Sequence, residues 1–166
     1  MAMSDQQSSG LAGVSACAEA TTAKEAAFRI DYPLAAARNT RVIAVDAAAG
    51  EMVRRASELT WAQARFYTVT DPGHTLLAVT GESVDLADAL EGSNTVVLVS
   101  VDGSNAAAVG TIGAACTVRG IMTAGLVVTR GALTSEALFH LRPHARILLV
   151  PAEEDDLVEL LRATRA

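Results

Sequence analysis

Two short stretches of the sequence contain residue types that could hold a ligand or act on it. Asp46-Ala47-Ala48-Ala49-Gly50 and Asp102-Gly103-Ser104-Asn105 each follow an apolar run and lead into a predicted helix. The first N–H groups of a helix have no partner within the helix and attract anions, so either stretch could bind a phosphate. Alternatively, Asp46 and Asp102 could face each other as an acid–base or metal-binding pair. Because two carboxylates repel an anion, the two hypotheses compete.

The second stretch has the better composition for a phosphate site. Gly103 permits backbone angles that other residues avoid, and Ser104 or Asn105 can cap the following helix. Arg130 follows a later apolar run and is the best-placed basic residue for an anionic ligand. The alternative is an ordinary strand–helix connection, which has the same turn composition. The first stretch offers Gly50 where a dinucleotide-binding loop needs three glycines.

Other residues indicate little chemistry. His140 and His144 are four positions apart, but Pro143 interrupts the helix between them, so we do not expect them to share a metal ion. His74 lies in a predicted turn, and Cys116 lies among small helical residues, where it fits a core position. We therefore predict no metal site and no catalytic residues.

The elements that position these residues follow from the hydrophobic pattern. Apolar runs predict strands at 41–46, 64–70, 75–79, 95–101, 121–129 and 146–150, and helices are predicted at 49–59, 83–92, 105–119, 133–141 and 153–166. In the second helix, Ser83 is the expected N-cap. Four runs, VIAV, VVLV, GLVV and ILLV, are continuously apolar, as in strands covered on both faces. Strands that alternate with helices predict a three-layer α/β/α, Rossmann-like domain with a mainly parallel sheet of five or six strands.

Length and composition limit the number of domains, the classes of partner and the location of the protein. We expect an Ala-rich, partly disordered segment over residues 1–40 and a single domain over 41–166. A net charge of −6, 4% aromatic residues and no basic run longer than Arg54-Arg55 argue against nucleic acid as a partner. The sequence has no apolar run of membrane-spanning length and no signal peptide, and its two cysteines have no metal-binding spacing. These features predict a cytoplasmic protein without a membrane partner.

From about Arg41 to Leu161 the order of segments resembles the N-terminal nucleotide-binding domain of the FtsZ/tubulin family. That family's first strand, glycine-rich loop and helix are matched by RVIAVDAAAGEMVRRA, and its phosphate-holding helix, strand and signature loop by DALEGSNTVVLVSVDGSNAAA. The two strands that follow are matched, with their flanks, by GIMTAGLVVT and LRPHARILLVPAEEDDLVELL. Sugar-phosphate isomerase (SIS) domains share the strand, the Ser/Gly loop and the small-residue helix. The resemblance implies a bacterial protein with a Rossmann-like fold.

The sequence departs from that family where nucleotide contacts are made. Alanines occupy 47–49 in place of loop glycines, and their side chains would crowd a nucleotide. The signature GGGTGTG corresponds to Val101–Asn105, which keeps one glycine and adds a carboxylate. Ala152 stands where the family has an Asn that contacts guanine, and the sequence ends where the family continues into its central helix and second domain. The resemblance therefore implies the fold and argues against GTPase activity.

Together these observations lead us to expect a non-catalytic α/β protein that acts by binding, as a homo-oligomer or within a larger protein assembly. The sequence identifies no definite cofactor for it. The alternative is an enzyme or sensor that binds a nucleotide or another phosphorylated small molecule at the 102–105 loop and Arg130. A third hypothesis, based on analogy of fold alone, is an FtsZ-like regulator that docks on a true filament former.

Overall fold

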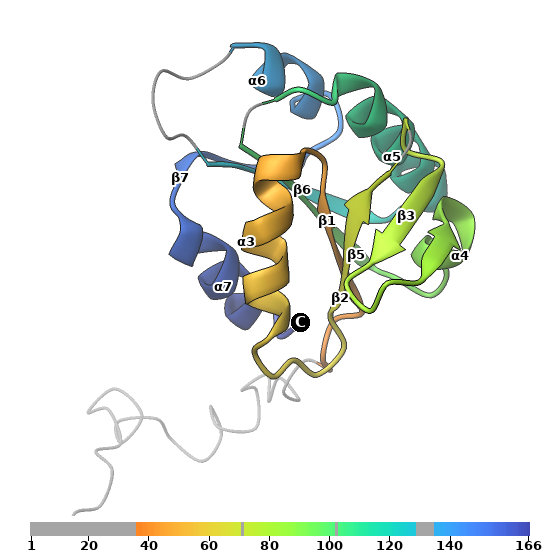
Figure 1. Cartoon of the computed structure of the whole chain (residues 1–166), viewed down its shortest axis with the longest axis vertical. Helices are drawn as coiled ribbons and strands as arrows, with labels where there is room; N and C mark the ends of the chain where they lie inside the picture. Colours follow the sequence, from red (N-terminus) through yellow and green to blue (C-terminus); the bar gives the residue numbers. More distant parts are fainter. Residues whose placement is uncertain (1–35, 71, 102, 129–134) are drawn as a thin grey trace, which may run out of the picture. The chain divides into compact units, whose positions relative to one another are not determined.

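The computed structural model describes residues 36–70, 72–101, 103–128 and 135–166 (Figure 1). The N-terminal segment expected over residues 1–40 lies outside this range as far as residue 35. Two of the candidate site residues, Asp102 and Arg130, also lie outside the described residues.

A mixed sheet of seven strands forms the centre of the fold, in the order β4-β3-β2-β1-β5-β6-β7. The strands β2, β1, β5, β6 and β7 are parallel, which confirms a mainly parallel α/β sheet. In chain order these five strands follow the 2-1-3-4-5 arrangement of flavodoxin-like doubly wound sheets. The bounds are β1 Thr40–Ala44, β2 Arg65–Val69, β3 Thr75–Ala78, β4 Ser83–Asp85, β5 Thr95–Ser100, β6 Met122–Val128 and β7 Ile147–Ala152.

The sheet has more strands than the five or six predicted, because a hairpin extends one edge. β3 pairs antiparallel with β2, and β4 pairs antiparallel with β3. Residues 70–74 between β2 and β3 are too few for the crossover helix that a parallel connection needs. The expectation that Ser83 caps a helix is wrong: Ser83 begins β4, and the side chain of Asp85 caps the next helix by accepting a hydrogen bond from the N–H of Ala87 (2.8 Å).

Helices cover both faces of the sheet, so the three predicted layers are present (Figure 1). The bounds are α3 Ala47–Ser57, α4 Leu86–Leu90, α5 Ala106–Arg119, α6 Ser135–Leu141 and α7 Glu154–Ala163. Helices α3 and α7 pack side by side on one face, over a core that includes Val42 and Leu126. Helices α4, α5 and α6 cover the other face, over a core that includes Ile43 and Leu98.

Burial along the strands follows their position in the sheet. Every residue of β1 and β5 is buried, and so is β6 after its first residue, as their continuous apolar runs predict. The same prediction is wrong for β7, in which only Ala152 is buried. β7 is the outermost strand on its side and has one neighbour, and its side chains other than that of Ala152 remain at least partly accessible.

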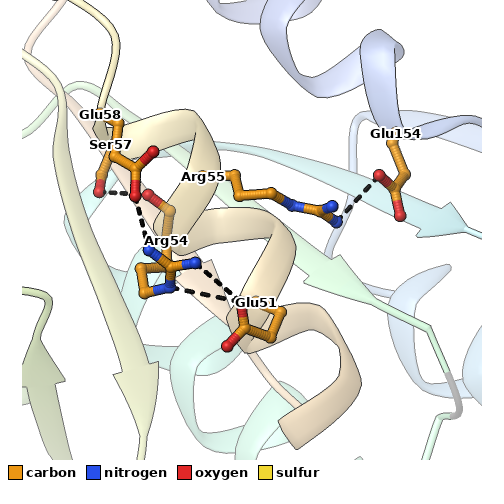
Figure 2. Close-up of polar contacts among 6 residues, drawn as sticks. All are labelled: Glu51, Arg54, Arg55, Ser57, Glu58 and Glu154. Atoms are coloured by element: carbon orange, nitrogen blue, oxygen red, sulfur yellow. Dashed lines mark hydrogen bonds and ion pairs between the residues drawn. The ribbon is translucent and has the colours of Figure 1, made fainter.

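The helix ends match the sequence at several positions. Asn105, one of the two N-caps predicted, caps α5, and Gly120 ends the helix in a left-handed conformation (φ 67°). Helix α7 has an acidic first turn and Arg162 in its last turn, which suits the helix dipole. Figure 2 shows how α3 and α7 are joined at the surface by an ion pair between Arg55 and Glu154 (2.9 Å). No helix in the described part of the chain is long and apolar enough to cross a membrane.

Candidate functional site

The candidate site lies at the carboxyl ends of β1 and β5. These strands are parallel neighbours, and the chain continues from β1 to β2 on one side before it returns to β5 on the other. This reversal of strand order is the place where open α/β sheets usually bind ligands. It brings together the two stretches predicted from the sequence, because one follows β1 and the other follows β5.

Asp46 is the centre of this region, and its side chain is 7% exposed. One carboxylate oxygen, Oδ1, accepts a hydrogen bond from the N–H of Ala49 and so caps α3 (2.8 Å). The other, Oδ2, accepts from the hydroxyl of Ser100 (2.8 Å) and from the N–H of Val101 (2.8 Å) and of Gly103 (3.4 Å). The carboxylate therefore fastens the start of α3 to the loop that follows β5.

The second stretch is shaped by the same hydrogen bonds. Gly103 has φ 72°, and its N–H also approaches the hydroxyl oxygen of Ser100 (3.2 Å). Ser104 is exposed, while the side-chain oxygen of Asn105 accepts from the N–H of Ala108 (3.4 Å). Gly103 thus has the left-handed conformation that favours glycine, and Asn105 has the capping role predicted for it.

The first stretch is a helix start, with Asp46 as its N-cap. Helix α3 begins at Ala47, and the N–H of Gly50 donates to the backbone carbonyl of Asp46 (3.2 Å). A β-carbon added at Gly50 would meet the nearest atom of Thr68 at 3.5 Å, an ordinary contact. Gly50 is therefore a helical residue whose own N–H is already bonded.

Two neighbours of the site were not singled out from the sequence. Ser100 is buried and joins the Asp46 carboxylate to the Gly103 amide; a lone polar residue in the apolar run VVLVSV was the available signal. Gly73, at the tip of the β2–β3 hairpin, lies against α5. A β-carbon there would come within 3.0 Å of the carbonyl oxygen of Ala108. The hairpin tip therefore packs on the first turn of α5, beside the second stretch.

The remaining candidate residues have structural surroundings. Gly113 makes room for His144, since a β-carbon on Gly113 would lie 2.2 Å from the imidazole Cγ. Helix α6 ends at Leu141, so His140 and His144 do not share a helix, as predicted. Cys116 is fully buried, and burial raises the pKa of its thiol, which leaves it protonated and unreactive. Among the described residues no group of three or more His, Cys, Asp or Glu side chains could hold a metal ion.

A groove of about 690 Å³ lies at the opposite, amino end of the parallel strands. Apolar side chains contribute much of its lining, and Leu59 and Val79 are 44% and 42% exposed. Its charged rim residues are Arg65, Glu82 and Asp88. This groove is separate from the two stretches that the sequence singled out.

Comparison with known proteins gives little beyond this geometry. No family model matches the sequence, and no curated protein matches it. Among solved structures, the chain is similar to a Burkholderia pseudomallei protein described as pilus assembly-related, with 17% sequence identity and a TM-score of 0.43. The match covers 76% of this chain and 88% of that one. A likeness at this level carries no argument about the function of this chain.

Proposed function

We propose that this chain is a non-catalytic binding or assembly protein with a degenerate nucleotide-binding fold. One observation carries the proposal: the Asp46 carboxylate accepts hydrogen bonds from the backbone N–H groups of Ala49, Val101 and Gly103. Amides at the start of a helix and in a strand–helix loop are the groups that hold a phosphate in folds of this kind. Here a side chain of the protein itself uses them.

A phosphate at this position would meet two obstacles. It would have to displace the carboxylate from amides it already satisfies, and a buried carboxylate without those donors is costly. If the carboxylate stayed, the phosphate would lie beside a like charge where water screens poorly. Both effects oppose the binding of a nucleotide. They support a protein that acts by binding a partner at its surface.

The relationship to the FtsZ/tubulin-type domain is part of this proposal. The order of strands and helices from Arg41 onward supports the relationship. The alanines that form the first turn of α3, where that family has loop glycines, support the loss of nucleotide binding. On this basis the chain would keep the fold of that domain without its ability to bind a nucleotide. The partner would be another protein or a second copy of this chain.

A thermal-shift screen of the purified protein against GTP, GDP, ATP, NAD and sugar phosphates, with and without magnesium, tests the proposal. We expect no ligand to raise the midpoint of unfolding, because binding to the folded state alone would raise it. Efficient turnover of any of these compounds, or a reproducible rise that follows ligand concentration, would overturn the non-catalytic interpretation.

The second candidate function is an enzyme or sensor of a phosphorylated small molecule. It is favoured by the left-handed conformation of Gly103, the exposure of Ser104 and the position of both before the 14-residue helix α5. Asp102 and Arg130 would complete this site, and both lie outside the described residues. If a ligand stabilises the protein, Gly103→Asp should abolish the effect. Gly81→Asp is the matched control, because Gly81 also has a positive φ (92°) and no atom lies within 4 Å of an added β-carbon.

A further inference from the structure

The outer edge of β7 has an unusual composition for an exposed sheet edge. Ile147 is 40% exposed, Leu148, Leu149 and Val150 are partly exposed, and Pro151 is exposed. The opposite edge strand, β4, has only three residues, of which Ser83 and Asp85 are exposed. A longer apolar edge strand is a template for pairing with another strand, whereas short polar edges resist pairing.

The direction of the backbone groups on this edge follows from one hydrogen bond. The N–H of Arg146 donates to the carbonyl of Thr123, the residue just before Ala124, which is the register partner of Ile147 (2.8 Å). The carbonyl of Thr123 therefore faces β7, and in a parallel ladder the residue opposite Ala124 bonds to the residues on either side of Ala124. Ile147 and Leu149 thus direct their N–H and C=O groups toward β6, and Leu148 directs its own away from it. One residue of β7, Leu148, therefore presents its main-chain donor and acceptor to a partner strand.

The second half of β7 is protected from pairing. The register with β6 shifts between Leu126 and Val128, and Pro151 lacks a backbone N–H. Bulges and prolines are the features by which sheet edges avoid extended association. Strand pairing would thus be confined to Ile147–Leu149, and the residues around it would have to supply the rest of an interface.

Charge is distributed unequally between the two ends of β7. Arg142 and Arg146 are exposed near its first residue, while Glu153 and Asp155 are exposed just after its last residue. In the described part of the chain, neither arginine side chain has an ion-pair partner. The chain as a whole has a net charge of −6. The basic end is therefore a local feature of this edge.

A two-fold axis through the middle of the edge would match these charges. Two copies related in this way place their β7 strands antiparallel, with the first residues of one strand beside the last residues of the other. The Arg142–Arg146 end of each copy then lies beside the Glu153–Asp155 end of its partner. Phe139, which is 73% exposed on α6, and Pro143 lie near the basic end and offer apolar area at the same contact.

We propose that the β7 edge, defined as Phe139, Arg142, Arg146, Ile147, Glu153 and Asp155, binds the same edge of a second copy of this chain. The occupant is a second copy because the edge is complementary to itself: its strand is limited to a short central pairing and its ends have opposite charges. This inference rests on the proposed function and adds a surface and a partner to it.

Sedimentation velocity on the full chain over a range of concentrations tests the inference. We expect reversible dimers, which weaken as salt is raised because the contact includes exposed charge pairs. Ile147→Lys places a charge on the edge and should raise the dimer dissociation constant by about tenfold or more. The matched control is Val79→Lys, at a residue of similar exposure (42%) beside the distant groove, and it should leave the dimer unchanged.

A charge-exchange experiment identifies the contact itself. Arg142→Glu/Arg146→Glu makes both ends acidic, and Glu153→Arg/Asp155→Arg makes both ends basic, so each double variant should sediment as a monomer. An equimolar mixture of the two should form a mixed dimer, because each acidic end then meets a basic end. A circular dichroism spectrum like that of the original protein shows that each double variant is folded.

Three outcomes would overturn the inference. They are a monomer at every concentration, a dimer that survives both Ile147→Lys and the charge reversals, and a mixture that fails to associate. A fourth, a dimer lost on removal of residues 1–35 and kept in Ile147→Lys, would also overturn it and would assign the contact to the N-terminal segment. None of these results bears on nucleotide binding, so a flat ligand screen with a monomeric protein would leave the proposed function standing with another partner.

Discussion

Buried side chains of opposite charge lie at the two ends of β1. Each of them forms hydrogen bonds with backbone groups at its own end of the sheet. At the carboxyl end, Asp46 accepts hydrogen bonds from backbone N–H groups of α3 and of the loop after β5. At the amino end, the Arg41 side chain is 2% exposed and donates to the carbonyls of Ala89 (2.6 Å) and Glu91 (3.1 Å) and to the side-chain oxygen of Asn39.

The difference in sign follows from the direction of the chain. In a parallel α/β sheet, helices begin at the carboxyl end of the strands and finish at the amino end. Unpaired N–H groups therefore gather at one end and unpaired C=O groups at the other. The acidic Asp46 therefore lies among the N–H donors, and the basic Arg41 lies among the C=O acceptors. At the carboxyl end, Asp46 thus accepts hydrogen bonds from backbone N–H groups in the place where doubly wound folds commonly bind ligands.

The largest effect is expected from Asp46→Ala. The substitution removes the acceptor of one buried and two partly buried N–H groups and of the Ser100 hydroxyl, and should lower the free energy of unfolding by about 3 kcal/mol. Urea denaturation followed by circular dichroism measures the change, with the exposed Glu82→Ala expected within about 0.5 kcal/mol of the original protein. A loss below about 1 kcal/mol would mean that Asp46 does not hold the two loops together.

Arg41→Met should have the next largest effect. Methionine fills much of the same apolar space, but the carbonyls of Ala89 and Glu91 lose their donor, which should cost about 2 kcal/mol. Burial lowers the pKa of the guanidinium, so part of the benefit of these hydrogen bonds is already offset by desolvation. We therefore expect a smaller loss than for Asp46→Ala.

The neighbouring strand supplies a control for this variant. Arg65 is the register partner of Arg41 on β2 and is exposed. Arg65→Met should change the free energy of unfolding by less than about 0.5 kcal/mol. Equal losses for the two substitutions would contradict a special role for the buried arginine.

Two glycines at opposite ends of β3 extend the comparison to the hairpin. Gly73 (φ 91°) and Gly81 (φ 92°) have the same backbone strain when replaced by alanine, about 1 kcal/mol. At Gly73 the added β-carbon would also lie 2.9 Å from Cβ of Thr111 and 3.0 Å from the carbonyl oxygen of Ala108, whereas at Gly81 it would meet open space. Gly73→Ala should therefore cost about 1 kcal/mol more than Gly81→Ala in denaturation experiments. Equal costs would show that the hairpin tip is not packed on α5.

The sequence predicted local features of this arrangement and missed the long-range ones. The capping role of Asn105 follows from residues within one turn, so short-range chemistry was enough to suggest it. The four continuous apolar runs also marked their strands. The Asp46 carboxylate, by contrast, bonds to Ser100 and Gly103, which are 54 and 57 positions away. Such a pairing depends on strand order, which no local pattern states.

Other features gave a misleading local signal. Residues 83–85 are three residues of mixed polarity before a helix, and β4 forms only because β3 offers it a partner. The last apolar run forms β7, which is the last strand in the order of the sheet and therefore lies at its edge. The local sequence does not state this order. The predicted roles of Asp102 and Arg130 stay predictions.

The smallest effect is expected where charges remain in water, at the surface ion pair between α3 and α7 (Figure 2). The side chains of Arg55 and Glu154 are 50% and 43% exposed, so solvent and salt screen their attraction. Glu154→Gln should cost about 0.5 kcal/mol or less, and the cost should shrink further at about 0.5 M salt, where the Debye length is short. The losses at Asp46 and Arg41 should persist in the same salt because their partners are buried. A larger, salt-resistant loss at Glu154 would mean that the contact between α3 and α7, and not the two buried charges, fixes the ends of the sheet.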